Sequence, residues 1–134
     1  MEIVRLDHVN IRTTRLDEMI KWYTDVLGLR IGFRPNFPFG GAWLYAGEIA
    51  VVHLIQIDEA SAIGSEASLK LEHFALRANG QSEFEERLKK KNEKYSCVEL
   101  TDANLVLYNI WDPDGNHLHV DFALADSADD RVAS

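Results

Sequence analysis

The amino-acid sequence predicts an α+β fold made of two tandem modules, each with the element order strand, helix, strand, strand, strand. An internal repeat is the main observation: residues 6–13 read LDHVNIRT, and residues 71–78 read LEHFALRA. The histidines of these two motifs are 65 residues apart (73 − 8), and a second pair, His53 and His119, is 66 residues apart (119 − 53). One four-stranded sheet with one helix cannot bury both of its faces. We therefore expect the βαβββ modules to form a curved, partly closed sheet with the helices outside and a trough inside.

The first module is expected at about 3–57 and begins with a strand over 3–12, where apolar and polar residues alternate. Successive side chains of a strand point to opposite faces, so Val9 and Ile11 are expected to face a core. The opposite, polar set faces a cavity or water and consists of His8, Asn10 and Arg12.

A helix is expected from Thr14, with Asp17 in a variant of the capping box and Gly28 as the glycine after the last turn. Apolar residues recur at helical spacing between these ends. Three strands are then expected at 29–34, 42–46 and 49–56. The last of them places His53 on the same face as its apolar neighbours two residues away.

Two segments of the first half are predicted to be loops. Residues 35–41 contain two prolines and two glycines, which interrupt strands. Phe37 and Phe39 in this loop indicate either a lid or pocket wall, or an ordinary loop on the surface. Residues 58–68 are acidic and rich in small residues, so they are the best candidate for a linker between the modules.

The second module is expected at about 69–123, with its helix over 82–92 and with Ser82 and Glu85 as a capping box. Its strands are expected at 69–77, 96–100, 105–111 and 117–122. The final strand places His117, His119 and Asp121 on one face. We expect residues 1–134 to form a single domain and 124–134 to be a flexible tail.

The four repeated histidines predict a metal site. Two of them lie on the first strand of a module and two on the last. If these strands are neighbours, each module presents two imidazoles side by side, and a pseudo-twofold arrangement of the modules would bring all four together. Converging imidazoles suit a divalent ion such as Zn, Fe, Ni, Cu or Mn, whereas a single histidine on a strand can equally be a hydrogen-bonded structural residue. The predicted ligands are His8, His53, His73 and His119.

Other polar residues are predicted to contact a substrate: Asn10, Arg12, Arg77, Tyr108 and His117, with Tyr45 as a further candidate. The two arginines occupy matching positions of the repeat, where they could bind a carboxylate or form ion pairs at a rim. His117 could support a ligand of the metal, line a pocket or lie exposed at the edge of its strand. The sequence assigns no catalytic residue.

Composition weighs against several classes of protein. A net charge of −8 opposes nucleic-acid binding. No run of 18 apolar residues is present, and residues 1–5 show no export signal. A single cysteine cannot form an internal disulfide, so a cytoplasmic protein is expected, with Cys97 as a buried strand residue. The absence of a phosphate-binding glycine motif and of a G-x-S-x-G motif weighs against kinases and serine hydrolases.

Several motifs together resemble the vicinal oxygen chelate superfamily, which includes glyoxalase I, extradiol dioxygenases, methylmalonyl-CoA epimerase, and fosfomycin and bleomycin resistance proteins. These motifs are LDHVNI at 6–11, WYTDVLGL at 22–29, LEHFAL at 71–76 and DPDGN at 112–116. They follow the order of the superfamily along nearly the whole chain. The resemblance implies paired βαβββ modules, a metal on the concave face of the sheet, and catalysis by chelation of two neighbouring substrate oxygens.

The superfamily's metal positions correspond to His8, His53, His73 and His119. Its members commonly carry a carboxylate where His119 stands, so this chain lacks that base, and Asp121 on the same face is a candidate replacement. The resemblance implies a divalent-metal-dependent enzyme, glyoxalase-like (lyase or isomerase) or dioxygenase-like, that acts on a small oxygenated organic molecule. The alternative is a non-catalytic small-molecule or drug-binding protein of the resistance type. In either case we expect a homodimer.

Overall fold

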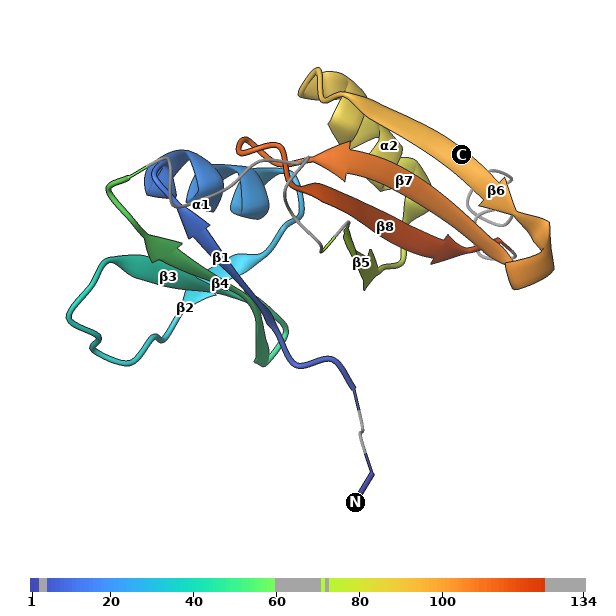
Figure 1. Ribbon diagram of the computed structural model, residues 1–134. Coiled ribbons are helices and arrows are strands. Elements are labelled where there is room, and N and C mark those ends of the chain that lie inside the picture. Colours follow the sequence, from blue (N-terminus) through green and yellow to red (C-terminus); the bar gives the residue numbers. More distant parts are fainter. Residues whose placement is uncertain (3–4, 60–70, 72, 125–134) are drawn as a thin grey trace. The chain divides into compact units, whose positions relative to one another are not determined.

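The computed structural model describes residues 1–2, 5–59, 71 and 73–124. The chain divides into two units, Met1–Ser65 (unit 1) and Glu66–Ser134 (unit 2). Each unit has one α-helix and an open four-stranded sheet, and the order of these elements is the same in both (Figure 1). The predicted α+β class and the tandem modules are therefore confirmed. Most of the predicted linker (60–68) and of the predicted tail (125–134) lies outside the described residues.

Unit 1 consists of β1 (Val9–Thr13), α1 (Leu16–Asp25), β2 (Arg30–Gly32), β3 (Gly41–Ala46) and β4 (Ile49–Gln56). The strand order in its sheet is β1-β4-β3-β2. β1 runs parallel to β4, and the other two pairs are antiparallel. The first and last strands of the module are thus neighbours, as the histidine argument required. β1 begins later than predicted, at Val9 rather than near residue 3.

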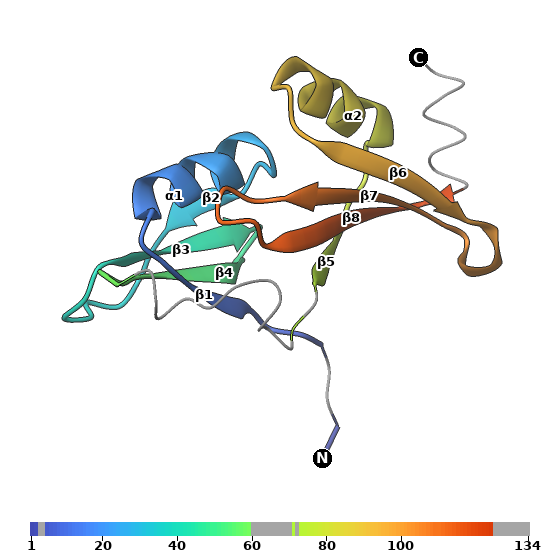
Figure 2. The ribbon, with the colours of Figure 1, turned by 45° about the horizontal axis from the view of Figure 1, so that its top comes forward.

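The alternation of side chains divides the unit 1 sheet into a covered face and an open face. On the covered face Leu44, Val52 and Leu54 are at most 1% exposed. Helix α1 lies over this face and contributes Met19 and Tyr23, both fully buried (Figure 2). Removal of this apolar surface from water, at about 25 cal/mol per Å², holds the helix on the sheet. Among the described residues of unit 1, no helix lies over the other face of the sheet.

Unit 2 repeats this arrangement with β5 (Phe74–Arg77), α2 (Gln81–Lys90), β6 (Tyr95–Leu100), the 3₁₀ turn η2 (Thr101–Ala103), β7 (Leu105–Trp111) and β8 (His117–Ala123). The strand order is β5-β8-β7-β6, with β5 parallel to β8. Burial alternates along β7 and β8, which leaves one face apolar and buried. Phe84 and Leu88 of α2 are buried with that face. The predicted start of β5 at 69 falls largely outside the described residues, and the strand begins at Phe74.

The helix beginnings differ from the prediction. Neither helix has a side-chain cap. The backbone N–H of Arg15 donates to Thr13 Oγ1 (2.9 Å) just before α1, and α2 follows Gly80, which has a φ of +86°. The capping roles predicted for Thr14 and Ser82 are therefore wrong. The turns that leave β1 and β5 set the start of each helix, and the left-handed backbone at Gly80 suits glycine.

The end of α1 agrees with the prediction. Gly28 has a φ of +71°, and the backbone N–H of Leu29 donates to the carbonyl of Tyr23 at 3.1 Å. The backbone N–H of Gly28 also donates to the carbonyl of Thr24 at 3.1 Å, which is the αL pattern, in which a left-handed glycine lets the chain turn back over the last helical carbonyls.

Cys97 is exposed rather than buried, contrary to the prediction. It lies on β6, which pairs only with β7 in the described sheet and forms its edge. Five of the six β6 residues are exposed, so apolar character in an edge strand did not imply burial here. Within the described part of the chain, no helix is long and apolar enough to cross a membrane.

Candidate functional site

The open face of the unit 1 sheet carries the histidines of this unit. His53 on β4 is aligned with Asn10 of β1 on one side and with Trp43 of β3 on the other. Residues opposite one another across paired strands point to the same face. His8 lies two residues before Asn10 and so shares that face. The register therefore places two imidazoles and one indole in a single row across three strands.

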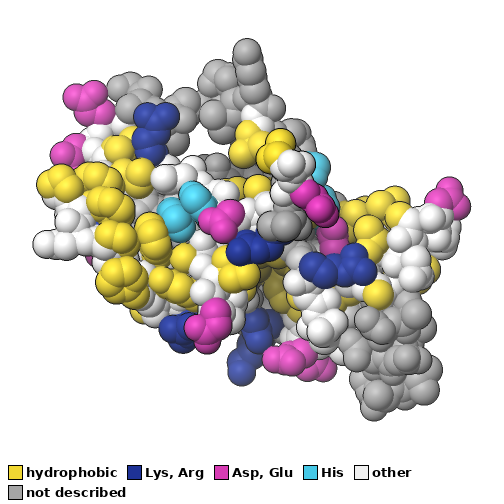
Figure 3. Space-filling view, turned by 90° about the horizontal axis from the view of Figure 1, so that it is seen from below, with side chains coloured by type: hydrophobic (Ala, Val, Ile, Leu, Met, Phe, Trp, Pro, Cys, Tyr) yellow, Lys and Arg dark blue, Asp and Glu magenta, His cyan; other side chains and the backbone are white. Residues whose placement is uncertain are grey.

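The rings of this row are stacked. The His8 and His53 ring centroids are 3.8 Å apart with an interplanar angle of 11°, and those of His53 and Trp43 are 4.0 Å apart, also at 11°. The row continues into the loop between β2 and β3, where Phe37 lies 6.4 Å from Trp43 and 5.2 Å from Phe39, centroid to centroid. We call these five rings the aromatic row. In the space-filling view, hydrophobic side chains gather beside histidine on this surface (Figure 3).

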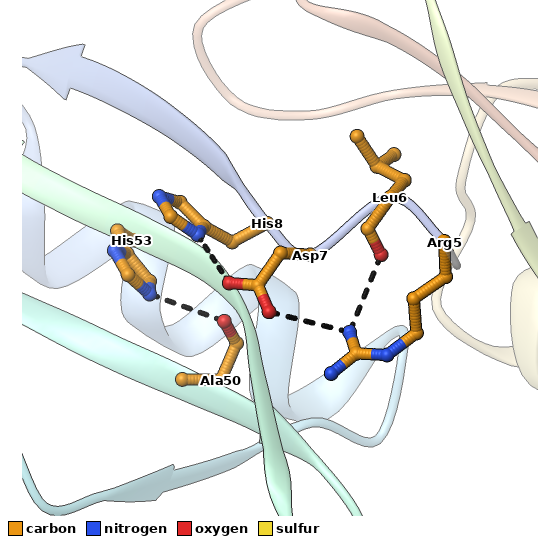
Figure 4. A network of polar contacts seen from close by, with 6 residues as sticks. All are labelled: Arg5, Leu6, Asp7, His8, Ala50 and His53. Atoms are coloured by element: carbon orange, nitrogen blue, oxygen red, sulfur yellow. Dashed lines mark hydrogen bonds and ion pairs between the residues drawn. The ribbon is translucent and has the colours of Figure 1, made fainter. Parts of the chain in front are cut away.

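Hydrogen bonds fix both imidazoles of the row (Figure 4). His8 Nδ1 donates to Asp7 Oδ2 at 2.7 Å, and Arg5 pairs with the same carboxylate at 3.3 Å. His53 Nε2 donates to the carbonyl of Ala50 at 3.1 Å. The bond from His8 lowers the pKa of Asp7. Burial, followed by the neighbouring His8 ring, lowers the pKa of His53 below its ordinary value of 6.5, so His53 is neutral near pH 7.

Unit 2 places its own histidines together, in a different geometry. His119 is aligned with Ala75 of β5, which brings it beside His73, with ring centroids 4.5 Å apart and planes at 40°. His119 Nδ1 donates a hydrogen bond to Asp121, which orients the ring and leaves Nε2 as the nitrogen that could bind a metal. His117 lies 5.2 Å from His73, centroid to centroid, so the unit contains a cluster of three imidazoles.

The units differ at one repeated position. Trp43 is aligned with His53 in unit 1, whereas Asn109 is aligned with His119 in unit 2. Asn109 Oδ1 accepts a hydrogen bond from His117 Nε2 at 2.8 Å. The same sheet position is therefore aromatic in one unit and polar in the other. Unit 1 offers the edges of three stacked rings, and unit 2 offers hydrogen-bonding groups.

The histidine pairs differ in how well they fit a metal ion. An imidazole binds a metal through a lone pair in the plane of its ring, at about 2.0–2.1 Å for Zn. The His8 and His53 planes are nearly parallel and 3.8 Å apart at their centroids, so both cannot point at one ion without a rotation. His73 and His119 are inclined at 40° and fit better. Among the described residues, no group of three or more His, Cys, Asp or Glu is placed to hold a metal. The set His8, His53, His73 and His119 remains a prediction.

Most of the predicted substrate-contacting residues lie exposed on their strands. Asn10, Arg12 and Arg77 are exposed, and His117 is partly buried and stacked on Trp111, with ring centroids 5.3 Å apart. The hydroxyl of Tyr45 donates a hydrogen bond to the carbonyl of Phe33, in the loop between β2 and β3, at 2.6 Å.

Tyr108 does not lie where it was predicted. It is fully buried on the face covered by α2, and alternation along β7 places it opposite to Asn109. Its hydroxyl accepts a hydrogen bond from Gln81 Nε2 (2.8 Å) and donates to Glu85 Oε2 (3.0 Å). Tyr108 therefore joins helix to sheet and is not a polar group of the open face.

Sequence reasoning missed Trp43 and Asp7. Alternation along β3 did not decide which face of the sheet Trp43 occupies. A register irregularity lies between Leu44 and Tyr45, next to it. The alignment of Trp43 with His53 across an antiparallel pair was the signal that could have found it.

A model of the Glyoxalase/Bleomycin resistance protein/Dioxygenase superfamily matches residues 5–120. The chain belongs to this superfamily. The resemblance seen in the sequence motifs is thereby confirmed, and the four histidines all lie within the matched segment. No curated protein matches the chain.

Solved structures share the fold of this chain at low sequence identity. A glyoxylase/bleomycin resistance protein/dioxygenase domain from Frankia sp. EAN1pec is 20% identical with a TM-score of 0.75, covering 91% of this chain and 99% of that one. Lactoylglutathione lyase from Agrobacterium tumefaciens is 17% identical with a TM-score of 0.68, covering 93% and 98%. TnmS3, an antibiotic binding protein from Streptomyces sp. CB03234, is 14% identical with a TM-score of 0.68, covering 92% and 98%. At these identities the similarity shows the fold alone.

Proposed function

We propose that this protein is a small-molecule-binding member of the superfamily that holds a flat, conjugated ligand against the aromatic row of unit 1. The observation that carries the proposal is the parallel stacking of His8, His53 and Trp43 on the open face. The fold similarity to an antibiotic binding protein is compatible with this role.

The stacked rings cover one another's faces, so edge-to-face contact is what would let such a row select flat molecules. Aromatic faces carry negative charge and their edges positive charge, so rings attract other flat rings in offset or tilted arrangements. Phe37 and Phe39 are 39% and 43% exposed, and the His8 side chain is 38% exposed. These surfaces are costly to leave in water, and a flat ligand would cover them. An aromatic contact of this kind contributes about 0.5–1.5 kcal/mol beyond the area it buries, so losing one ring would weaken binding by up to about tenfold.

The proposal is tested with a panel of planar heteroaromatic compounds, whose binding is measured by isothermal titration calorimetry. Trp43→Leu and Phe37→Leu are expected to weaken binding of the best compound by up to about tenfold. Phe33→Leu is the matched control, because Phe33 is 75% exposed in the same loop and lies outside the row. Unchanged affinity in both row variants, or an equal loss in Phe33→Leu, would contradict the proposal.

Metal-dependent catalysis is the second candidate function, and the geometry of unit 2 favours it. His119 is oriented by Asp121 beside His73, an arrangement common around metal-bound imidazoles. If a divalent ion is bound through His8, His53, His73 and His119, it would supply Lewis-acid chemistry to a small oxygenated substrate of a glyoxalase-like or dioxygenase-like reaction. Asp121 would hold the His119 ring in one tautomer.

Elemental analysis separates the two candidates. Stoichiometric Zn, Fe, Ni, Cu or Mn in the purified protein, lost in both His73→Ala and His119→Ala, would favour the metalloenzyme. Protein that takes up none of these metals on dialysis against each of them would favour the binding protein. Sedimentation velocity on the same samples tests the expected homodimer.

A further inference from the structure

The aromatic row ends in a positively charged residue, and this suggests the chemical class of the ligand. We infer that Arg34 selects flat ligands that carry an anionic group, in particular aromatic carboxylates. This inference rests on the proposed function of the row and adds a charge requirement to it.

Arg34 is held against the loop end of the row. Its guanidinium carbon lies 4.9 Å from the ring centroid of Phe37 and 5.3 Å from that of Phe39. Nη2 donates to the backbone carbonyl of Phe39 at 2.8 Å. A guanidinium has five N–H donors, so this single bond leaves several for a ligand. Contact with two rings and one carbonyl orders the side chain before any ligand arrives, which reduces the entropy lost on binding.

Gly41 permits this placement. A Cβ at position 41 would lie 3.0 Å from Arg34 Nη2 and 2.3 Å from the carbonyl oxygen of Leu54. Any other residue would push against the neighbouring strand and against the guanidinium together. The close approach of Arg34 to β3 is thus built into the backbone at the start of that strand.

No carboxylate of the described residues pairs with Arg34. Some of the other described arginines have such partners, since Arg5 pairs with Asp7 and Arg87 with Glu83, whereas Arg12, Arg30 and Arg77, like Arg34, have none among the described residues. The chain carries a net charge of −8, so acidic side chains are abundant, yet the guanidinium on the row is left to hydrogen-bond elsewhere. Arginine binds carboxylates through parallel N–H donors and stacks on rings, which are the two contacts that an aromatic carboxylate requires.

The opposite end of the row fixes the direction in which such a ligand lies. The carboxylate of Asp7 is hydrogen-bonded to His8 at that end. It would repel an anionic group there, whereas Arg34 would attract one at the loop end. The row is therefore polarised, and the ligand is expected to place its carboxylate at Arg34 and its ring toward Trp43.

Two ligands of matched shape test the inference: 2-naphthoate, which is anionic, and 2-naphthamide, which is neutral. Calorimetry on the wild-type protein is expected to show about tenfold tighter binding of the naphthoate. Arg34→Gln is expected to abolish this preference, because naphthoate would lose its ion pair with the guanidinium and naphthamide has none to lose. Arg30→Gln is the control, because Arg30, which is exposed, also lies over a ring, that of Tyr45 at 5.3 Å, outside the row.

The outcomes separate this inference from the proposed function. Equal binding of both compounds to the wild type, with Arg34→Gln unchanged, would overturn the role of Arg34 and leave the stacking role intact. A preference lost equally in Arg30→Gln would also overturn it, since general surface charge would then suffice. If neither compound binds and no planar compound of the wider panel binds either, the proposed function fails and this inference with it.

Discussion

Tyr108→Phe is predicted to destabilise unit 2 through the loss of one hydroxyl. That hydroxyl accepts a hydrogen bond from Gln81 Nε2 (2.8 Å) and donates to Glu85 Oε2 (3.0 Å), which ties α2 to the middle of the sheet. Burial raises the pKa of Tyr108, so the hydroxyl remains a donor at any pH at which the protein is studied. The ring itself is retained in phenylalanine, which leaves the apolar packing in place.

The magnitude follows from what each partner loses. Gln81 is 6% exposed, so water cannot readily replace the hydroxyl, and the loss of a buried hydrogen-bond partner costs about 1–3 kcal/mol. Glu85 is partly exposed and still accepts a hydrogen bond from the hydroxyl of Tyr95 at 3.2 Å, so losing the Tyr108 hydroxyl costs Glu85 little free energy. The free energy of unfolding is therefore expected to fall by about 2 kcal/mol. With a urea m-value of about 2 kcal/mol per M, the midpoint moves down by about 1 M.

Urea denaturation followed by circular dichroism measures this shift, and hydrogen exchange shows whether the loss is confined to unit 2. Tyr95→Phe is the control: it removes a hydroxyl from the same carboxylate at a partly exposed position, and a change below about 0.5 kcal/mol is expected. If the two variants lose equal stability, or if Tyr108→Phe loses none, the reasoning that burial makes these hydrogen bonds stabilising is refuted.

Three further outcomes are expected. Histidine-resolved NMR is expected to show a His53 pKa below 6.5. Any stability that depends on neutral His53 is therefore present above pH 6.5 and is lost as the pH falls through the lowered pKa of the folded state. His8→Ala should move the pKa of His53 upward. Leu88→Ala, at a fully buried site of α2, is expected to cost about 2–5 kcal/mol in thermal or urea unfolding, whereas Lys90→Ala should leave stability nearly unchanged. Asp112→Ala removes a buried carboxylate that accepts two backbone N–H bonds of 2.9 Å in the turn before β8, and a loss of about 1.5–3 kcal/mol is expected by the same assay.

The repeat explains why so much of the fold followed from the sequence. Two copies of one pattern constrain each other, and the match of His8 with His73 and of His53 with His119 predicted which strands would be neighbours. The strands at 49–56 and 105–111 were predicted with their observed limits, because strong alternation or β-branched composition is local information. Helix starts were predicted less well, because the turns leaving β1 and β5 override side-chain capping preferences.

The candidate site was predicted only in part, for a geometric reason. Alternation indicates which residues share a face of one strand, but not which residue of the next strand stands opposite. Only the alignment of Trp43 with His53 places Trp43 in the aromatic row. A register irregularity lies next to this pair, and no local sequence pattern predicts it. Tyr108 was assigned to the wrong face because a tyrosine is compatible with both a buried and an open position.

The sequence by itself determined the duplicated α+β plan, the superfamily and the imidazole-bearing strands, since these depend on periodicity and on motifs that are read along the chain. Only the tertiary structure decided that the unit 1 rings are parallel and those of unit 2 inclined, and that Arg34 lies on Phe37 and Phe39. Ring orientation and cross-strand alignment arise from contacts between residues far apart in sequence. They are set when the sheet and its loops pack, which no local pattern encodes.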